Sequence, residues 1–166
     1  PEGFFRRIGN TDVIGITVAT PTLSSALKLA QIAKNASPGV KIVFGGAHPS
    51  ALPRDVVSYD SVDFVIKGEG ELTLLELLKV LTKGGDFTNI DGLLFKDGER
   101  IIENKERAFI EDLDTIPFPA RHLFKNSTYT YPDALHSRTA ALITSRGCPG
   151  RCIYCSTALK RFRARS

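Results

Sequence analysis

The sequence predicts an α/β protein with a parallel sheet, helices on both faces of that sheet, and a β-hairpin extension. Three near-continuous apolar runs, rich in β-branched residues, occur at 13–18, 40–44 and 62–66, as in strands that are buried on both faces. A stretch with helical periodicity follows each run. This alternation predicts right-handed crossovers between parallel strands.

Three helices are expected after these strands. The first has apolar residues at helical spacing over 23–33, with Thr20 predicted as its N-cap and Pro21 as its first helical residue. A shorter helix is predicted over 53–59, and a strongly amphipathic one over 72–81.

A hairpin and then a linker follow the third helix. Two apolar runs flank Asp97 and Gly98, which predicts a hairpin with a type I′ turn. Periodicity is lost over 106–139, where prolines and aromatics indicate a linker that anchors on a domain surface. We therefore divide the chain into a first domain at 1–105, this linker, and a second unit at 140–166.

The composition is that of an ordinary globular chain, with 42% hydrophobic and 24% charged residues among 166. No apolar run reaches the roughly 18–20 residues that a membrane span requires, and no signal peptide is visible. The three cysteines are clustered, so we expect a reducing compartment, the cytoplasm. Methionine is absent, and we expect the chain to be a piece of a longer protein.

The net charge of +4 comes from the end of the chain. Without Lys160, Arg161, Arg163 and Arg165 the count is 22 − 4 = 18 basic residues against 18 acidic ones. Such a basic segment can meet phosphate, but a solvated helix start is the favoured interpretation. We expect no nucleic-acid partner.

All cysteines lie in one short segment as Cys148, Cys152 and Cys155, in the pattern C-x3-C-x2-C. Glycine and proline between them predict a loop that can wrap three thiols around one point. The apolar run at 140–143 before it predicts a buried strand. Folds of the α/β class usually place their chemistry at the carboxyl ends of such strands.

Three interpretations of these thiols compete. Three thiolates on an iron–sulfur cubane would leave one iron open, since a full set is four. A zinc site needs a fourth ligand, for which His136 is the nearest upstream candidate. The thiols could also be inert. A disulfide framework is disfavoured by the odd count and the crowded spacing.

The cysteine pattern, with an aromatic residue before its last cysteine and an apolar run ahead of it, resembles the radical S-adenosylmethionine (radical SAM) enzymes. The resemblance covers only the first strand and loop of their (β/α) barrel. It implies a [4Fe-4S] cluster on Cys148, Cys152 and Cys155, with Tyr154 as the aromatic position. It also implies S-adenosylmethionine at the open iron, a 5′-deoxyadenosyl radical, and an electron donor such as flavodoxin or ferredoxin.

The first domain resembles the Rossmann-like (flavodoxin-like) cobalamin-binding domain that precedes this barrel in one large subgroup. The resemblance rests on four segments, in the expected order: Gly15-Ile16-Thr17, Thr20-Pro21-Thr22, Gly45-Gly46-Ala47-His48-Pro49 and Gly68-Glu69-Gly70-Glu71. It implies cobalamin across the strand ends. The residues implied to line it are Thr17, Thr20, Gly45, Gly46, His48, Gly68, Glu69, Gly70 and Glu71.

Simpler roles compete for some of these residues. For His48 a loop histidine bonded to backbone is favoured over a cobalt ligand. For Glu71 a charge in the first helical turn is favoured over an acid/base pair with Glu69. By itself, Gly68-x-Gly70 indicates a tight turn, because a third glycine at dinucleotide-binding spacing is missing.

Two hypotheses for function follow. The first is a fragment of a cobalamin-dependent radical SAM enzyme that acts on a small molecule by methyl transfer or anaerobic cyclisation, the fragment alone being inactive. The second is a Rossmann-like ligand-binding module with a zinc-binding cysteine loop.

Overall fold

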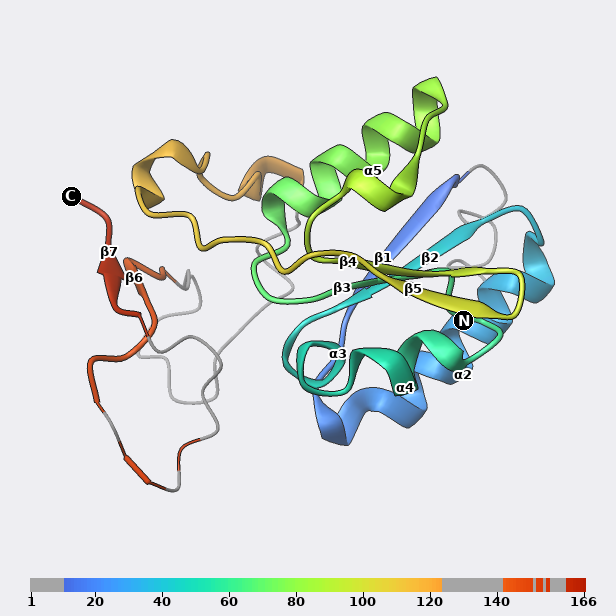
Figure 1. The fold of residues 1–166 in the computed structure, drawn as a ribbon, viewed down its shortest axis with the longest axis horizontal. Helices are drawn as coiled ribbons and strands as arrows, with labels where there is room; N and C mark the ends of the chain where they lie inside the picture. The colour runs from blue at the N-terminus through green and yellow to red at the C-terminus, as the bar shows by residue number, and fades with distance from the viewer. Residues whose placement is uncertain (1–10, 124–141, 151, 154, 156–160) are drawn as a thin grey trace. The chain divides into compact units, whose positions relative to one another are not determined.

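The fold is described from a computed structural model, which describes residues 11–123, 142–150, 152, 153, 155 and 161–166 (Figure 1). The chain divides into two compact units, Pro1–Phe109 and Ile110–Ser166. They are called unit 1 and unit 2 below, and each is described by itself.

Unit 1 is built on a five-stranded mixed sheet with strands in chain order. Three strands run parallel, and the last two are antiparallel and form the predicted hairpin. The strands are β1 (Val13–Thr17), β2 (Lys41–Gly45), β3 (Phe64–Ile66), β4 (Leu93–Asp97) and β5 (Arg100–Glu103). The predicted fold class, a parallel sheet with a hairpin extension, is confirmed for this unit.

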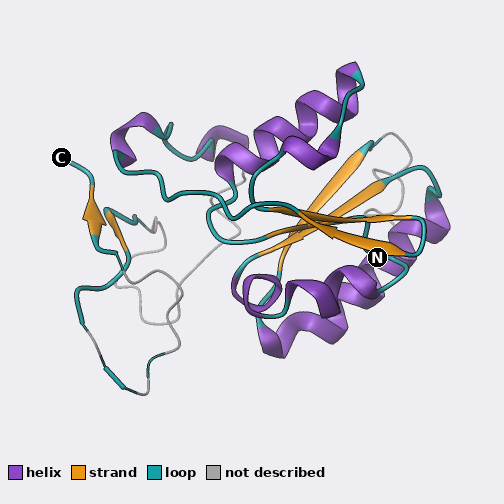
Figure 2. Ribbon diagram, in the orientation of Figure 1, coloured by secondary structure: helices purple, strands orange, loops and turns teal. Residues whose placement is uncertain are grey.

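Helices cover both faces of the sheet, as predicted (Figure 2). One face carries α2 (Leu23–Ala36), α3 (Ala47–Ala51) and α4 (Pro53–Ser58), and the other carries α5 (Glu71–Lys83). Two crossovers that both step from β1 towards β3 place their helices on the same face when both are right-handed. The helices α2 and α4 lie together in this way.

Alternate residues of the central strands build two cores. Ile42 and Phe44 of β2 pack with α2 and α4, while Val43 between them packs with α5. Ile42, Val43 and Phe44 therefore each have apolar neighbours on their own face of the sheet, which explains the continuous apolar run. A large side chain buried here contributes about 1.5–3 kcal/mol relative to an exposed one.

The start of the first helix differs from the prediction. Thr20 opens a short 3₁₀ turn, η1 (Thr20–Thr22), and α2 begins only at Leu23. The Thr22 hydroxyl, not Thr20, accepts a hydrogen bond from the Ala19 N–H at 3.0 Å and donates one to the Ala19 carbonyl at 2.9 Å. Thr22 therefore satisfies the local backbone groups, and the side chain of Thr20 is left to bond elsewhere.

The hairpin turn also needs a correction. Asp97 and Arg100 form the last strand pair, so the two turn residues are Gly98 and Glu99. Gly98 has φ +59°, and no non-glycine residue of the described chain has a positive φ. A type I′ turn requires a positive φ at both turn residues, so this turn fits type II′, which requires it only at the first.

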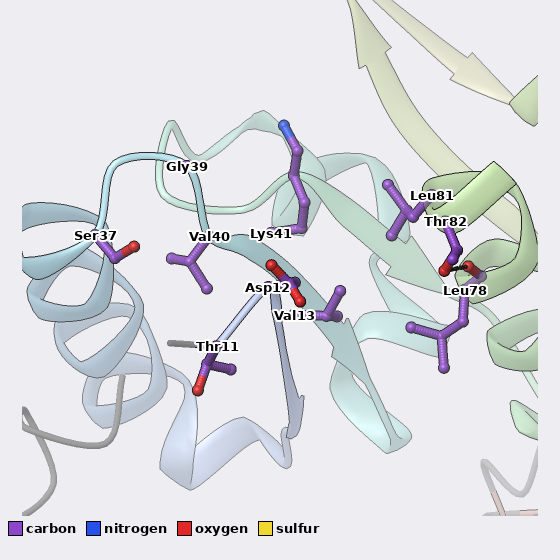
Figure 3. Close-up of a pocket in the computed structure, with 10 residues that line it drawn as sticks. All are labelled: Thr11, Asp12, Val13, Ser37, Gly39, Val40, Lys41, Leu78, Leu81 and Thr82. Carbon is purple, nitrogen blue, oxygen red and sulfur yellow. Dashed lines mark hydrogen bonds between the residues drawn. The ribbon is translucent and has the colours of Figure 1, made fainter. Parts of the chain in front are cut away.

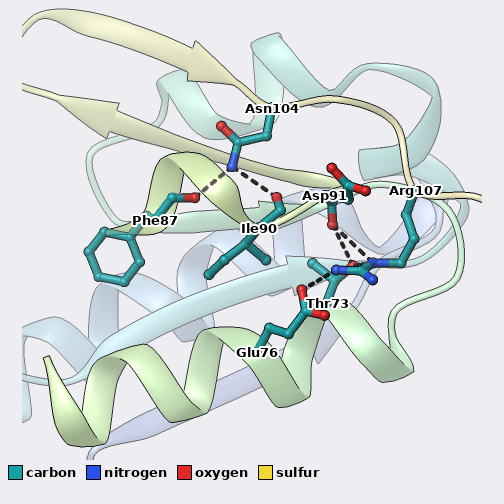
Figure 4. Close-up of polar contacts among 7 residues, drawn as sticks. All are labelled: Thr73, Glu76, Phe87, Ile90, Asp91, Asn104 and Arg107. Carbon is teal, nitrogen blue, oxygen red and sulfur yellow. Dashed lines mark hydrogen bonds and ion pairs between the residues drawn. The ribbon is translucent and has the colours of Figure 1, made fainter. Parts of the chain in front are cut away.

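A polar network joins the start of α5 to the segment after the hairpin (Figure 4). The Arg107 guanidinium donates to the Thr73 hydroxyl at 2.7 Å and the Asp91 carbonyl at 3.1 Å, and pairs with the Glu76 carboxylate. The Thr73 hydroxyl itself donates to the same carbonyl at 2.8 Å. Asn104 donates to the carbonyls of Phe87 and Ile90. These bonds fix the chain where it leaves the sheet.

The predicted strand over 140–143 is wrong where the structure describes it. Leu142 and Ile143 are 68% and 77% exposed and lie outside any strand. Pairing begins at β6 (Ser145–Arg146), whose partner is β7 (Arg163–Ala164). An apolar run forms a buried strand only where neighbouring elements cover it, and the described part of unit 2 offers one two-residue partner.

The basic end is not a solvated helix start over 161–166. It forms β7, where Arg163 is buried and donates to the Ile110 carbonyl at 2.7 Å. Arg161 pairs with Glu111 at 2.6 Å, and Arg165 donates to the Ile116 carbonyl at 2.8 Å. The three arginines therefore bond to acceptors within unit 2, which argues against a free phosphate-binding patch.

Short 3₁₀ turns of unit 2 precede this end of the chain in sequence, and Asp114 of one of them bonds to Ser166. The 3₁₀ turns are η3 (Leu113–Thr115) and η4 (Arg121–Leu123). Hydrogen bonds from the Ser166 hydroxyl and the Ser166 N–H lower the pKa of Asp114, and the charge of Arg165 adds to the effect. Asp114 is therefore held in its charged form.

Among the described residues, no helix is long and apolar enough to cross a membrane.

Candidate functional site

The predicted cofactor residues of unit 1 gather at the carboxyl ends of its three parallel strands. They lie on three loops: the first loop (residues 17–20) after β1, the second loop (residues 45–50) after β2, and the third loop (residues 68–71) after β3. This row of loops is called the carboxyl edge below. Ligands of open α/β sheets bind outside such an edge.

Backbone packing requires a glycine at position 46. Gly46 has φ +100°, in the region that glycine tolerates best. A Cβ there would lie 3.0 Å from the Val18 carbonyl oxygen, 3.1 Å from the Val18 nitrogen and 3.0 Å from the Thr17 methyl group. The missing side chain lets the second loop lie directly against the first loop.

Hydrogen bonds tie the three loops together. The Val18 N–H donates to the Gly45 carbonyl at 2.8 Å, and the His48 N–H donates to the Val18 carbonyl at 3.1 Å. The Thr20 hydroxyl lies 3.1 Å from His48 Nδ1. Ser50 Oγ then accepts the Gly68 N–H at 3.0 Å. The first loop is thus bonded to the second, and the second to the third.

The helix α3 carries the side chains that make these ties. His48 is 8% exposed, and its ring bonds to a side chain, the Thr20 hydroxyl, where the sequence predicted a bond to backbone. The sequence did not predict α3, because five residues that include a proline carry no helical periodicity. Its residues fold as a helix because the neighbouring loops hold both of its ends.

The third loop combines an open backbone with a buried carboxylate. No heavy atom lies within 4 Å of where a Cβ of Gly68 would be, and Gly68 itself is exposed. Glu69 is 8% exposed. Glu71 is exposed in the first turn of α5, in the position expected of a charge that faces the helix dipole.

This geometry fits a large, flat ligand such as a corrinoid. Open backbone at Gly68 and the exposed Thr17 and Thr20 offer hydrogen-bonding groups without bulky side chains in front of them. The three loops are also bonded to one another, so they present one preformed surface. Cofactor sites are usually largely preformed in this way.

A hollow of unit 1 lies elsewhere, at the amino ends of the strands (Figure 3). It is lined by Asp12, Val13 and Lys41 of the sheet end and by Leu78 and Leu81 of α5. We give it less weight than the carboxyl edge, since the predicted residues and the glycine loops all lie at the opposite ends of the strands.

The cysteine loop of unit 2 exposes all three thiols. The Gly150 N–H donates to Cys148 Sγ at 3.3 Å. A Cβ at Gly150 would lie 3.4 Å from Cys148 Sγ and 3.7 Å from Cys152 Sγ. Two sulfurs therefore border one glycine, and a third thiol follows at Cys155, whose N–H donates to the Cys152 carbonyl at 3.1 Å.

Among the described residues no three of the His, Cys, Asp or Glu side chains are arranged to hold a metal ion. Thiolates are the residue type that holds iron–sulfur clusters, and Cys148, Cys152 and Cys155 are all exposed, but the structure does not bring the three sulfurs to one point. Tyr154 and His136 lie outside the described residues.

One residue of the carboxyl edge, Ser50, was missed by sequence reasoning. It directly follows the Gly-Gly-x-His-Pro segment, so its place beside the predicted residues was visible. Its bond to Gly68, 18 positions away, was not visible, because only the fold brings the two loops together.

Comparison with known families places the first part of the chain. Residues 2–78 match the family described as "B12 binding domain". This segment contains all three loops of the carboxyl edge.

Two curated relatives cover nearly the whole chain. An uncharacterized methyltransferase, PH0819, of Pyrococcus horikoshii is 35% identical over 93% of this chain. An anaerobic magnesium-protoporphyrin IX monomethyl ester cyclase of Synechocystis is 31% identical over 86%. The aligned part makes up 34% and 28% of these relatives, so the chain spans about a third of their length.

Two solved structures share the fold. The cobalamin-dependent S-adenosylmethionine radical enzyme OxsB superposes over 99% of this chain with a TM-score of 0.74 and 23% identity, and the match covers 22% of OxsB. The radical S-adenosylmethionine methyltransferase TsrM of Kitasatospora setae superposes with a TM-score of 0.69 and 18% identity. The match covers 99% of this chain and 34% of TsrM.

The chain therefore carries a cobalamin-binding domain of the Rossmann-like kind. Over nearly its whole length the chain is similar to one part of these larger proteins, which include a methyltransferase, a cyclase and radical S-adenosylmethionine enzymes.

Proposed function

We propose that this chain is part of a radical SAM enzyme that binds cobalamin at the carboxyl edge of unit 1 and a [4Fe-4S] cluster on the cysteine loop of unit 2. The observation that carries the proposal is the order of two features in one chain. A segment that matches the B12-binding family precedes a C-x3-C-x2-C loop.

Unit 1 would hold cobalamin through its three loops. The open backbone at Gly68 accepts a flat ring at close range, while Thr17 and Thr20 offer hydroxyls to its polar periphery. Gly45 and Gly46 have no side chains to project from the second loop, and His48 and Glu69 are buried. Cobalamin supplies a cobalt centre that can carry a methyl group or assist a rearrangement.

Unit 2 would hold the cluster through Cys148, Cys152 and Cys155, with Tyr154 beside them. A cluster with one open iron supplies a binding point for S-adenosylmethionine and an electron for cleavage of its sulfonium bond. A donor such as flavodoxin or ferredoxin would supply that electron. The exposure of all three thiols supports assembly at this loop.

The reaction of the whole enzyme on a small molecule would be methyl transfer or anaerobic cyclisation, in the cytoplasm. The relatives favour methyl transfer first, since they include an uncharacterized methyltransferase at 35% identity, and cyclisation second. We expect this chain alone to show no turnover.

Titration of the chain with hydroxocobalamin, followed by its visible spectrum, tests the site in unit 1. Gly68→Ala should weaken binding by about tenfold or more, because its methyl group would enter the open backbone surface. Gly98→Ala is the matched control, since both glycines have positive φ and open surroundings, at +77° and +59°. Equal binding by both variants would place cobalamin elsewhere.

Anaerobic reconstitution with iron and sulfide tests the loop in unit 2. The expected product is brown with cluster absorption, and Cys152→Ala should lose most of its iron, because two thiolates hold a cubane poorly. Stoichiometric zinc and no cluster in the full-length protein would instead support a binding module with a zinc loop.

A further inference from the structure

Gly68, the first residue of the third loop, has no side chain that could hold it against its neighbours. Gly68 has φ +77°, is exposed, and has no heavy atom within 4 Å of a Cβ position. Glycine also has more backbone freedom to lose than any other residue. The hydrogen bond of the Gly68 N–H is therefore a direct way to hold this residue in place.

The sheet ladder ends before this loop begins. The register between β2 and β3 pairs Val43 with Phe64 and Phe44 with Val65. Directly after β3 ends at Ile66, the Lys67 N–H donates to the Gly92 carbonyl at 2.9 Å, on the side of β4. Beyond the ladder, the bond from the Gly68 N–H to Ser50 Oγ at 3.0 Å joins the second and third loops.

Ser50 is itself well fixed. It lies on α3, where its N–H donates to the Gly46 carbonyl at 3.1 Å. Two residues earlier, His48 anchors the same helix to the first loop through Thr20 and Val18. The Ser50 hydroxyl therefore bonds the third loop to a helix that is itself bonded to the first loop.

We propose that Ser50 is a positioning residue for cobalamin, which holds the third loop in place through the Gly68 N–H. The proposal rests on the proposed function of unit 1 and adds a residue to it. Ser50 acts through the loop and needs no contact with the cofactor.

The test uses three variants of the 166-residue chain. Ser50→Ala removes the acceptor, and Ser50→Thr keeps a hydroxyl. Ser58→Ala is the matched control, because it removes a comparable bond of 2.7 Å, from its hydroxyl to the Asp55 carbonyl, within α4. Amide hydrogen exchange of residues 68–71 is measured without cofactor, and hydroxocobalamin affinity is measured by visible titration.

We expect Ser50→Ala to speed exchange over 68–71 by about fivefold and to raise the Kd for hydroxocobalamin by about fivefold, as the loss of one neutral hydrogen bond implies. Ser50→Thr should restore both values to within about twofold, and Ser58→Ala should change neither. The thermal midpoint should be the same for Ser50→Ala and Ser58→Ala.

Two results would overturn the proposal and differ from each other. Wild-type binding that Ser50→Ala leaves unchanged would remove Ser50 from cofactor binding, whatever the exchange rates show. A wild-type chain that does not bind hydroxocobalamin would overturn the proposed function of unit 1, and the role of Ser50 toward cobalamin with it. The exchange rates would then still show whether Ser50 holds the loop.

Discussion

Single backbone positions decide how close the loops of the carboxyl edge can lie. A Cβ at Gly46 would lie 3.0–3.1 Å from backbone atoms of Val18, closer than most Cβ atoms approach backbone, and the φ of Gly46 is positive. Gly39, in the loop before β2, has neither constraint. The same residue type therefore has a structural requirement at one position and none at the other.

Gly46→Ala should destabilise unit 1 by about 1–3 kcal/mol, since it adds backbone strain and a clash with Val18. Gly39→Ala should change the free energy of unfolding by no more than about 0.5–1 kcal/mol. Any change should be stabilising, because alanine reduces the conformational freedom of the unfolded chain. Chemical denaturation of both variants measures the difference. Equal stabilities would mean that the first two loops lie farther apart than described.

At the scale of elements, unit 1 uses polar side chains to fix the ends of helices. Arg107 holds the start of α5 through Thr73, Asp91 and Glu76, and its side chain is 13% exposed (Figure 4). Because α5 follows the third loop directly, this network holds the helix to which that loop is joined. The short α3 bonds the second loop to the first loop.

Arg107→Met should lower the free energy of unfolding by about 1–3 kcal/mol, because buried bonds to a charged group are lost. Arg54→Met is a suitable control. It removes an ion pair to Glu103 at 2.8 Å, but the Arg54 side chain is 62% exposed, and such pairs contribute less than about 1 kcal/mol. A larger loss for Arg54→Met than for Arg107→Met in urea denaturation would contradict this assignment.

At the scale of the whole molecule, the two units carry separate chemistry. Every cobalamin candidate lies between Thr17 and Glu71, and both apolar cores described for the sheet lie within unit 1. The thiols lie in unit 2. Cofactor binding by the first unit should thus need nothing from the second.

A chain shortened to end at Phe109 should bind hydroxocobalamin within about twofold of the full 166-residue chain, because unit 1 keeps its sheet, helices and loops. Visible titration of both chains, with circular dichroism as the control for folding, gives the comparison. A folded but non-binding short chain would show that unit 2 contributes to the cobalamin site.

The amino-acid sequence alone determined the parallel strands, the hairpin and the cysteine loop. Strands buried on both faces must be apolar throughout, and alternate residues of β2 indeed enter two cores. The thiol spacing is likewise a local property of the chain. These features depend on neighbours in sequence, and a pattern of neighbours can be read directly.

The tertiary structure decided what depends on distant partners. It converted the residues after Gly46 into α3, joined Ser50 to Gly68, and buried Arg163 against the Ile110 carbonyl. It also left Leu142 and Ile143 exposed, although their composition predicted a strand. A hydrogen bond across 18 or 53 positions leaves no periodicity in the sequence, because only the folded chain brings its two ends together.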